Sequence, residues 1–126
     1  MKPTIVIVSD DLLFWNLFTY SLSVKTLNLQ IYICKSFDEV IENESYKDSI
    51  LIIVDGGFSD MSSITVIQFL RMQKRTVSPI WFFPEIQTKE YLYKSQQIGV
   101  SRIILKPFDP ILISEEIILL LTKQTI

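Results

Sequence analysis

Five short apolar runs, separated by longer segments of helical periodicity, constrain the fold of this chain more than any other feature of its sequence. Four of the runs are almost continuously apolar, which is typical of strands buried on both faces of a parallel sheet. The run at residues 29–34 instead alternates apolar and polar residues, as a half-buried strand does. The predicted strands span residues 4–8, 29–34, 49–55, 79–83 and 102–105.

Segments with apolar residues at helical spacing follow each of these runs. The predicted helices span residues 11–24, 36–46, 62–74 (capped by Ser62 or Ser63), 88–98 and 110–123. Ser36 predicts an N-cap, with Glu39 as its capping-box partner. Gly99 suits the left-handed position that ends a helix. Asp109 predicts the cap of the last helix, and Pro110 suits its first turn.

Five strands that alternate with five helices predict an α/β fold with helices on both faces of a parallel sheet. Right-handed crossovers and the size of the chain favour a doubly wound, three-layer arrangement with strand order 2-1-3-4-5. The chain has 126 residues, and we expect residues 1–126 to form a single domain. Hydrophobic residues make up 48% of the chain, enough for a core without disulfides or a structural metal.

Composition excludes several classes of function. The net charge of −2 gives no general attraction to nucleic acid. The chain has no histidine, which removes histidine-activated nucleophiles and the usual zinc sites. Cys34 is the only cysteine, so a cytoplasmic, reducing setting is expected, and we interpret Cys34 as a strand residue and not a redox thiol. The apolar runs are too short or too closely flanked by charge to predict a signal peptide or a membrane span.

Charged residues follow three of the predicted strands. Asp10 and Asp11 follow the first strand, Asp55 ends the third and Lys106 follows the fifth. In open α/β sheets, ligands bind outside the carboxyl ends of the strands. Because the first and third strands should be neighbours, we expect three carboxylates to converge there with one amine nearby. An alternative for the Asp10–Asp11 pair is that it only favours a helix N-terminus through the helix dipole.

Three converging carboxylates repel one another, so at least one would be protonated near neutral pH unless positive charge intervenes. A divalent cation and the Lys106 ammonium can both supply that charge. Mg²⁺ prefers oxygen ligands and shares its sites with phosphate oxygens. A carboxylate beside Mg²⁺ can attack a phosphoryl group and form an acyl phosphate, while the metal and the lysine stabilise the transferring oxygens.

With these residues, essentially the whole chain resembles the receiver domain of bacterial two-component response regulators. Its motifs are an acidic pair after the first strand, an aspartate ending the third and Lys-Pro after the fifth. The resemblance implies that Asp55 accepts a phosphoryl group from a histidine kinase and that Lys106 contacts that group. It also implies that the peptide bond between Lys106 and Pro107 is often cis.

The resemblance further implies a weakly bound Mg²⁺ held by the acidic pair, by Asp55 and by the backbone carbonyl of Gly57. One alignment places Ser9 at the first acid of the pair and Asp10 at the second. A shift of one residue would instead match Asp10 and Asp11 to the pair directly. In either alignment Asp10 lies in the site.

Several residues depart from the receiver pattern. Pro84 replaces the hydroxyl residue of the family's switch, and Glu85 replaces a small residue that leaves room for the phosphoryl group. Ile103 replaces the aromatic residue of the second switch, and the loop at residues 56–61 lacks the usual Met-Pro-Gly. We expect Glu85 to point to solvent, with a role as an extra metal ligand or an internal phosphate mimic as the alternative.

Three functions remain open. The first is a receiver domain that serves a histidine kinase or phosphotransfer protein and a downstream output domain or protein. It would signal through helix four, strand five and helix five, with Tyr91, Tyr93 and the last helix as a possible homodimer face. The second is a pseudo-receiver, an interaction module without phosphorylation. The third is a flavodoxin-like flavin enzyme, which would need a Ser/Thr/Gly-rich loop where this chain is acidic.

We expect no enzymatic activity beyond slow self-phosphorylation and dephosphorylation, and no nucleic-acid or membrane partner.

Overall fold

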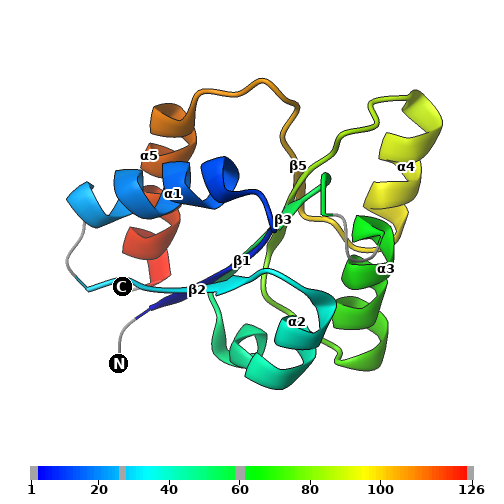
Figure 1. Cartoon of the computed structure of the whole chain (residues 1–126), viewed down its shortest axis with the longest axis horizontal. Helices are drawn as coiled ribbons and strands as arrows, with labels where there is room; N and C mark the ends of the chain where they lie inside the picture. Colours follow the sequence, from blue (N-terminus) through cyan, green and yellow to red (C-terminus); the bar gives the residue numbers. More distant parts are fainter. Residues whose placement is uncertain (1–2, 26–27, 59–61, 125–126) are drawn as a thin grey trace.

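A computed structural model describes residues 3–25, 28–58 and 62–124 of the chain. These residues form one five-stranded parallel sheet with the order β2-β1-β3-β4-β5, which confirms the predicted topology (Figure 1). The strands are β1 (Thr4–Val8), β2 (Gln30–Cys34), β3 (Leu51–Asp55), β4 (Ile80–Phe83) and β5 (Arg102–Ile103).

Helices cover both faces of the sheet, as the alternating pattern predicts. The helices α1 (Leu12–Lys25) and α5 (Pro110–Gln124) lie on one face, and α2 (Phe37–Asn43), α3 (Ser63–Gln68) and α4 (Lys89–Gln97) lie on the other (Figure 1). Among the described residues, no helix is both long enough and apolar enough to span a membrane.

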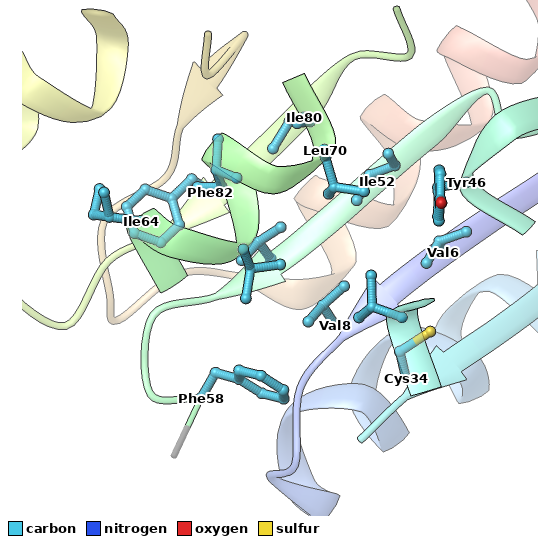
Figure 2. Packing of buried hydrophobic residues seen from close by; sticks show 14 residues of the cluster. Val6, Val8, Cys34, Tyr46, Ile52, Phe58, Ile64, Leu70, Ile80 and Phe82 are labelled. Atoms are coloured by element: carbon cyan, nitrogen blue, oxygen red, sulfur yellow. The ribbon is translucent and has the colours of Figure 1, made fainter. Parts of the chain in front are cut away.

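Two hydrophobic cores sit on the two faces of the sheet. Successive residues of a strand point to opposite faces, so Ile7 packs with α1 and α5 while Val8 packs with α2 and α3. The first core is aromatic: the rings of Phe83 and Phe108 lie 4.8 Å apart, and Phe18 stacks on Phe108. Figure 2 shows the second core, in which aliphatic residues such as Val6, Val8 and Ile52 pack with Tyr46, Phe58 and Phe82.

The central strands β1 and β3 are almost entirely apolar, which explains their position inside the sheet. β3 is buried along its whole length, and β1 is buried after its first residue. In the register of the sheet, Val8 pairs with Val54, and Asp55 pairs with Phe83. The last residues of β1, β3 and β4 therefore lie side by side, and the residues that follow these strands share one edge of the sheet.

The second helix is shorter than predicted. Ser36 caps α2 as expected, because its hydroxyl accepts the Glu39 N–H at 3.1 Å. The Glu39 carboxylate, however, accepts the N–H of Lys35 and does not close the predicted capping box on Ser36. Glu44 then adopts a left-handed conformation with φ of 55°, and a separate 3₁₀ turn, η1 (Ser45–Asp48), follows. The single helix predicted over residues 36–46 is therefore wrong.

The third helix also departs from its prediction. Ser62 occupies the N-cap position without a side-chain capping bond, and the Ser63 hydroxyl donates to the backbone oxygen of Asp55 at 2.8 Å. Ser62 is therefore the N-cap residue by position, as predicted, but neither serine supplies a side-chain capping bond. The last part of the predicted helix is a π-helical segment, η2 (Phe69–Gln73).

The remaining predicted helix ends are confirmed. Thr88 caps α4 by accepting the N–H of Tyr91, and Gly99 follows α4 with φ of 106°. Asp109 caps α5 by accepting the N–H of Ile111 at 2.9 Å. β5 has only two residues instead of the predicted four, and the Lys106–Pro107 peptide bond is cis.

Candidate functional site

Asp55, the last residue of β3, is a buried carboxylate with every oxygen engaged. Its side chain is 1% exposed. One oxygen, Oδ2, accepts the Ser9 hydroxyl at 2.7 Å. The other, Oδ1, accepts the Gly57 N–H at 3.1 Å and the Lys106 ammonium at 2.6 Å. Because a buried charge is costly unless it is paired and hydrogen-bonded, these three contacts explain how β3 can end in an acid.

Lys106 links three elements at the carboxyl edge of the sheet. Its side chain is 25% exposed, and its ammonium contacts Asp55 Oδ1 at 2.6 Å and Glu85 Oε1 at 2.5 Å. The same nitrogen lies 5.2 Å from the centre of the Phe14 ring, a cation–π distance. Burial lowers the pKa of Lys106, but hydrogen bonds and charge interactions with Asp55 and Glu85 outweigh it, so the pKa is raised. The site therefore carries a stable positive charge.

Ser9 is the β1-side partner of Asp55. It is fully buried, and its hydroxyl donates to Asp55 while accepting the Asp11 N–H at 3.0 Å. This position supports the alignment that places Ser9 at the first acid of the receiver pattern. A neutral hydroxyl thus occupies the place where a carboxylate would face Asp55.

The two acids after β1 do not form the predicted cluster of three carboxylates with Asp55. Asp10 and Asp11 are both exposed, and Asp11 Oδ1 accepts the N–H of Leu13 in the first turn of α1. The alternative interpretation, an acid at a helix N-terminus, therefore describes Asp11. Within residues 3–25, 28–58 and 62–124, no three acidic, histidine or cysteine side chains are placed to hold a metal ion. The expected convergence of three carboxylates is therefore wrong.

The magnesium prediction names Asp10, Asp11, Asp55 and the carbonyl of Gly57; because Asp11 Oδ1 accepts the N–H of Leu13, we consider Asp10, Asp55 and Gly57 as the donor set. These are hard oxygen donors, and Mg²⁺ usually binds one or two carboxylates and keeps several waters. Among the described residues, Asp55 Oδ2 accepts one hydrogen bond, from Ser9, which leaves it a lone pair. The residues thus fit a weakly held Mg²⁺, which stays a prediction.

The end of β4 lies against the turn after β3. The Gly56 N–H donates to Phe83 O at 2.8 Å. A Cβ on Gly56 would lie 2.6 Å from both Phe83 O and Glu85 N, and 2.7 Å from Pro84 Cα. Only glycine permits this close approach, which places Glu85 beside the site.

Glu85 does not simply point to solvent, as the sequence led us to expect. Its side chain is 53% exposed, but its carboxylate contacts the Lys106 ammonium. A Cβ on Gly57 would lie 3.0 Å from Glu85 Oε1, so the carboxylate also lies over the turn that follows Asp55. The expectation is therefore wrong for the carboxylate.

The two switch positions carry residues without the family's functional groups. Pro84 is buried and has neither a hydroxyl nor an N–H to offer an anion. Ile103 is half-buried and pairs with Phe82 in the sheet. The loop predicted to lack Met-Pro-Gly lies partly outside the described residues, at positions 59–61.

The sequence analysis did not predict two contacts of the site, Ser9 with Asp55 and Glu85 with Lys106. The register of the strands indicates both positions. Ser9 directly follows Val8, which pairs with Val54, so Ser9 must lie beside Asp55. Glu85 lies two residues beyond Phe83, the β4 partner of Asp55. Pairing the strand ends residue by residue would have brought both side chains into the site.

Solved structures of response regulators share this fold. A two-component response regulator from Clostridium difficile superposes with a TM-score of 0.82 at 18% identity, with 98% of each chain covered. A CheY-like receiver domain protein from Methanospirillum hungatei gives 0.79 at 19% identity, covering 99% of this chain and 98% of that one. The chemotaxis response regulator CheY4 of Vibrio cholerae gives 0.78 at 16% identity, covering 95% and 99%. The chain therefore has the fold of receiver domains.

Comparison of the sequence itself gives no further relatives: no protein-family model and no curated protein matches it.

Proposed function

We propose that this chain is a phosphoacceptor receiver domain of a two-component system. Asp55 takes the phosphoryl group from a histidine kinase or phosphotransfer protein in the cytoplasm. The observation that carries the proposal is the 2.6 Å contact between Lys106 and the buried Asp55 carboxylate at the carboxyl edge of a receiver-like sheet. The third function considered, a flavin enzyme, has no support, because the segment after β1 is acidic and Ser9 hydrogen-bonds Asp55.

The residues around Asp55 support its role as a nucleophile. An oxygen of the carboxylate forms a bond to phosphorus as the bond from phosphorus to the donor's histidine nitrogen breaks, which leaves an acyl phosphate. The Ser9 hydroxyl and the Gly57 N–H fix the plane of the carboxylate before the reaction. The Lys106 ammonium neutralises charge on the transferring oxygens.

Mg²⁺ would be held by Asp10, Asp55 and the carbonyl of Gly57. When bound, it would supply a second positive charge for the phosphoryl oxygens. The protein's own part is to keep Asp55 oriented and shielded from water. We propose that the chain has at most slow self-phosphorylation and dephosphorylation activity.

The proposed output surface consists of α4, β5 and α5. Exposed apolar side chains lie on two of these elements: Tyr93 on α4 is 65% exposed, and on α5 Ile111 is 58%, Leu112 56% and Leu119 62% exposed. Exposed groups of this kind mark association sites on otherwise polar surfaces. Phosphorylation would shift the domain between two states that pre-exist in equilibrium, and this surface would then bind an output domain, an output protein or a second copy of the chain.

Labelling with acetyl phosphate and Mg²⁺, followed by intact mass spectrometry, tests the proposal. We expect the wild type to gain one phosphoryl group that hydroxylamine removes, as acyl phosphates require. The variant Asp55→Asn should gain none. Asp38→Asn, which removes an exposed acid of α2, should be labelled like the wild type. Equal labelling of the wild type and Asp55→Asn would show that Asp55 is not the acceptor.

A second candidate, the phosphorylation-independent pseudo-receiver, is favoured by Pro84, Ile103 and the contact of Glu85 with Lys106. Such a module would use the same output surface without a covalent switch. Titration with beryllofluoride and Mg²⁺, followed by NMR, separates the candidates. Shifts at Asp55 and in α4 and α5 support the phosphoacceptor. Their absence would remove the phosphoacceptor and leave the pseudo-receiver.

A further inference from the structure

We infer that Glu85 is an internal anion that competes with the incoming phosphoryl group for Lys106. This inference rests on the phosphoacceptor role proposed above and adds a residue that sets the affinity of the site. Glu85 would lower the affinity of the site for a phosphoryl group, which must displace its carboxylate from Lys106.

The first argument is the number of hydrogen-bond donors. A lysine ammonium has three N–H groups. Asp55 Oδ1 takes one at 2.6 Å and Glu85 Oε1 takes a second at 2.5 Å. Only one remains for a phosphoryl group on Asp55, whose oxygens must nevertheless lie close to Lys106. An arriving anion must therefore either displace Glu85 or bind a lysine that has only one of its three N–H groups left to donate.

The second argument is position. Glu85 Oε1 would lie 3.0 Å from a Cβ on Gly57, so the carboxylate reaches over the turn that follows Asp55. Asp55 itself is 1% exposed. Glu85 therefore lies at the mouth of the site, where it adds bulk as well as negative charge against an approaching phosphoryl donor.

The third argument is that the carboxylate can leave. Its side chain is 53% exposed, so its release into water costs little beyond the ion pair with Lys106. Exposed ion pairs of this type are weak. Glu85 is thus suited to lower the affinity of the site by a moderate factor and not to block it.

Beryllofluoride titrations of the full chain with Mg²⁺, followed by the NMR shifts of site amides, test this competition. Glu85→Gln keeps the size of the side chain and removes its charge. We expect beryllofluoride to bind this variant about threefold to tenfold more tightly than the wild type, because an exposed like charge is lost next to the anion. Glu90→Gln, which removes an exposed acid from the first turn of α4, should bind like the wild type.

The variants distinguish charge from bulk. Glu85→Ala removes both, and it should also bind more tightly than the wild type. Tighter binding by Glu85→Ala but not by Glu85→Gln would assign the effect to bulk and overturn the charge competition. Wild-type affinity in both variants would overturn the inference while leaving the phosphoacceptor role intact. Binding only after substitution of Glu85 would support the inference and refute phosphorylation of the unmodified chain.

Thermal unfolding gives a readout that does not depend on phosphoryl chemistry. If Glu85 binds Lys106 in solution, Glu85→Gln should lower the unfolding temperature of the wild type more than it lowers that of Lys106→Met. An equal change in both backgrounds would show that the pair is not formed and would overturn the inference even where no variant binds beryllofluoride.

Discussion

Gly56 offers a sharp test of how the site is built. An alanine Cβ at this position would lie 2.6 Å from Phe83 O and from Glu85 N, and 2.7 Å from Pro84 Cα. All three are backbone atoms, which cannot rotate away as a side chain can. Gly56→Ala should therefore push the turn after β3 away from the end of β4.

The magnitude follows from three terms. Forcing extra volume into a packed site costs about 1–3 kcal/mol. Loss of the 2.8 Å hydrogen bond from Gly56 N–H to Phe83 O adds about 0.5–1.5 kcal/mol. Replacing glycine restricts the unfolded chain and returns about 0.4–1 kcal/mol. We expect Gly56→Ala to lower the free energy of unfolding by about 2–3 kcal/mol, measured by urea denaturation with circular dichroism.

Gly57→Ala is the matched control. Its added Cβ would meet only the end of the Glu85 side chain, at 3.0 Å, and that side chain is free to move toward solvent. We expect its free energy of unfolding to stay within about 0.5 kcal/mol of the wild type. Equal stabilities of the two variants would refute the close approach of β4 to Gly56 and, with it, the placement of Glu85 over the site.

Three further predictions concern other buried or capping groups. Ser9→Ala should lower the free energy of unfolding in urea by about 1–3 kcal/mol, because it leaves Asp55 Oδ2 buried without its hydroxyl partner. Ser36→Ala should lower it by about 1 kcal/mol, since the cap on the Glu39 N–H is lost. Burial, and to a smaller extent Glu39, raises the pKa of Cys34 from 9.0 to about 11. The unfolded thiol therefore loses its proton first, so stability should fall as the pH rises from 9 toward 11, and Cys34→Ala should show a smaller fall over this range than the wild type.

The fold was predictable because its signals are repeated and local. Each buried strand is a short apolar run, and each crossover contains a segment of helical spacing, so the order of the strands follows from a few general rules. The pairing of Asp55 with Lys106 follows in turn, because the carboxyl ends of parallel strands meet at one edge. The extent of the domain over residues 1–126 stays a prediction.

The structure differs from the predictions at places where a single backbone angle or the direction of one side chain decides the local structure. Glu44 ends α2 by adopting a left-handed conformation, which apolar spacing does not reveal in a residue other than glycine. Asp11 accepts the N–H of Leu13, a local contact at the start of α1 that the position of Asp11 after β1 does not distinguish from a role in the site. Glu85 turns toward Lys106 because Gly56 lets the chain after β4 approach, a contact between residues distant in sequence.

The positions of Ser9 and Glu85 together explain how the site balances its charge. Relative to the receiver pattern, the residue facing Asp55 from β1 has lost a carboxylate, and the residue after Pro84 has gained one. The Ser9 hydroxyl donates a hydrogen bond to Asp55, whereas a carboxylate there would repel it. The Glu85 carboxylate instead contacts Lys106, on the side away from Ser9. The Glu85 carboxylate thus lies on the lysine side of the site, where, under the proposed function, it would meet the oxygens of a phosphoryl group and not the cation.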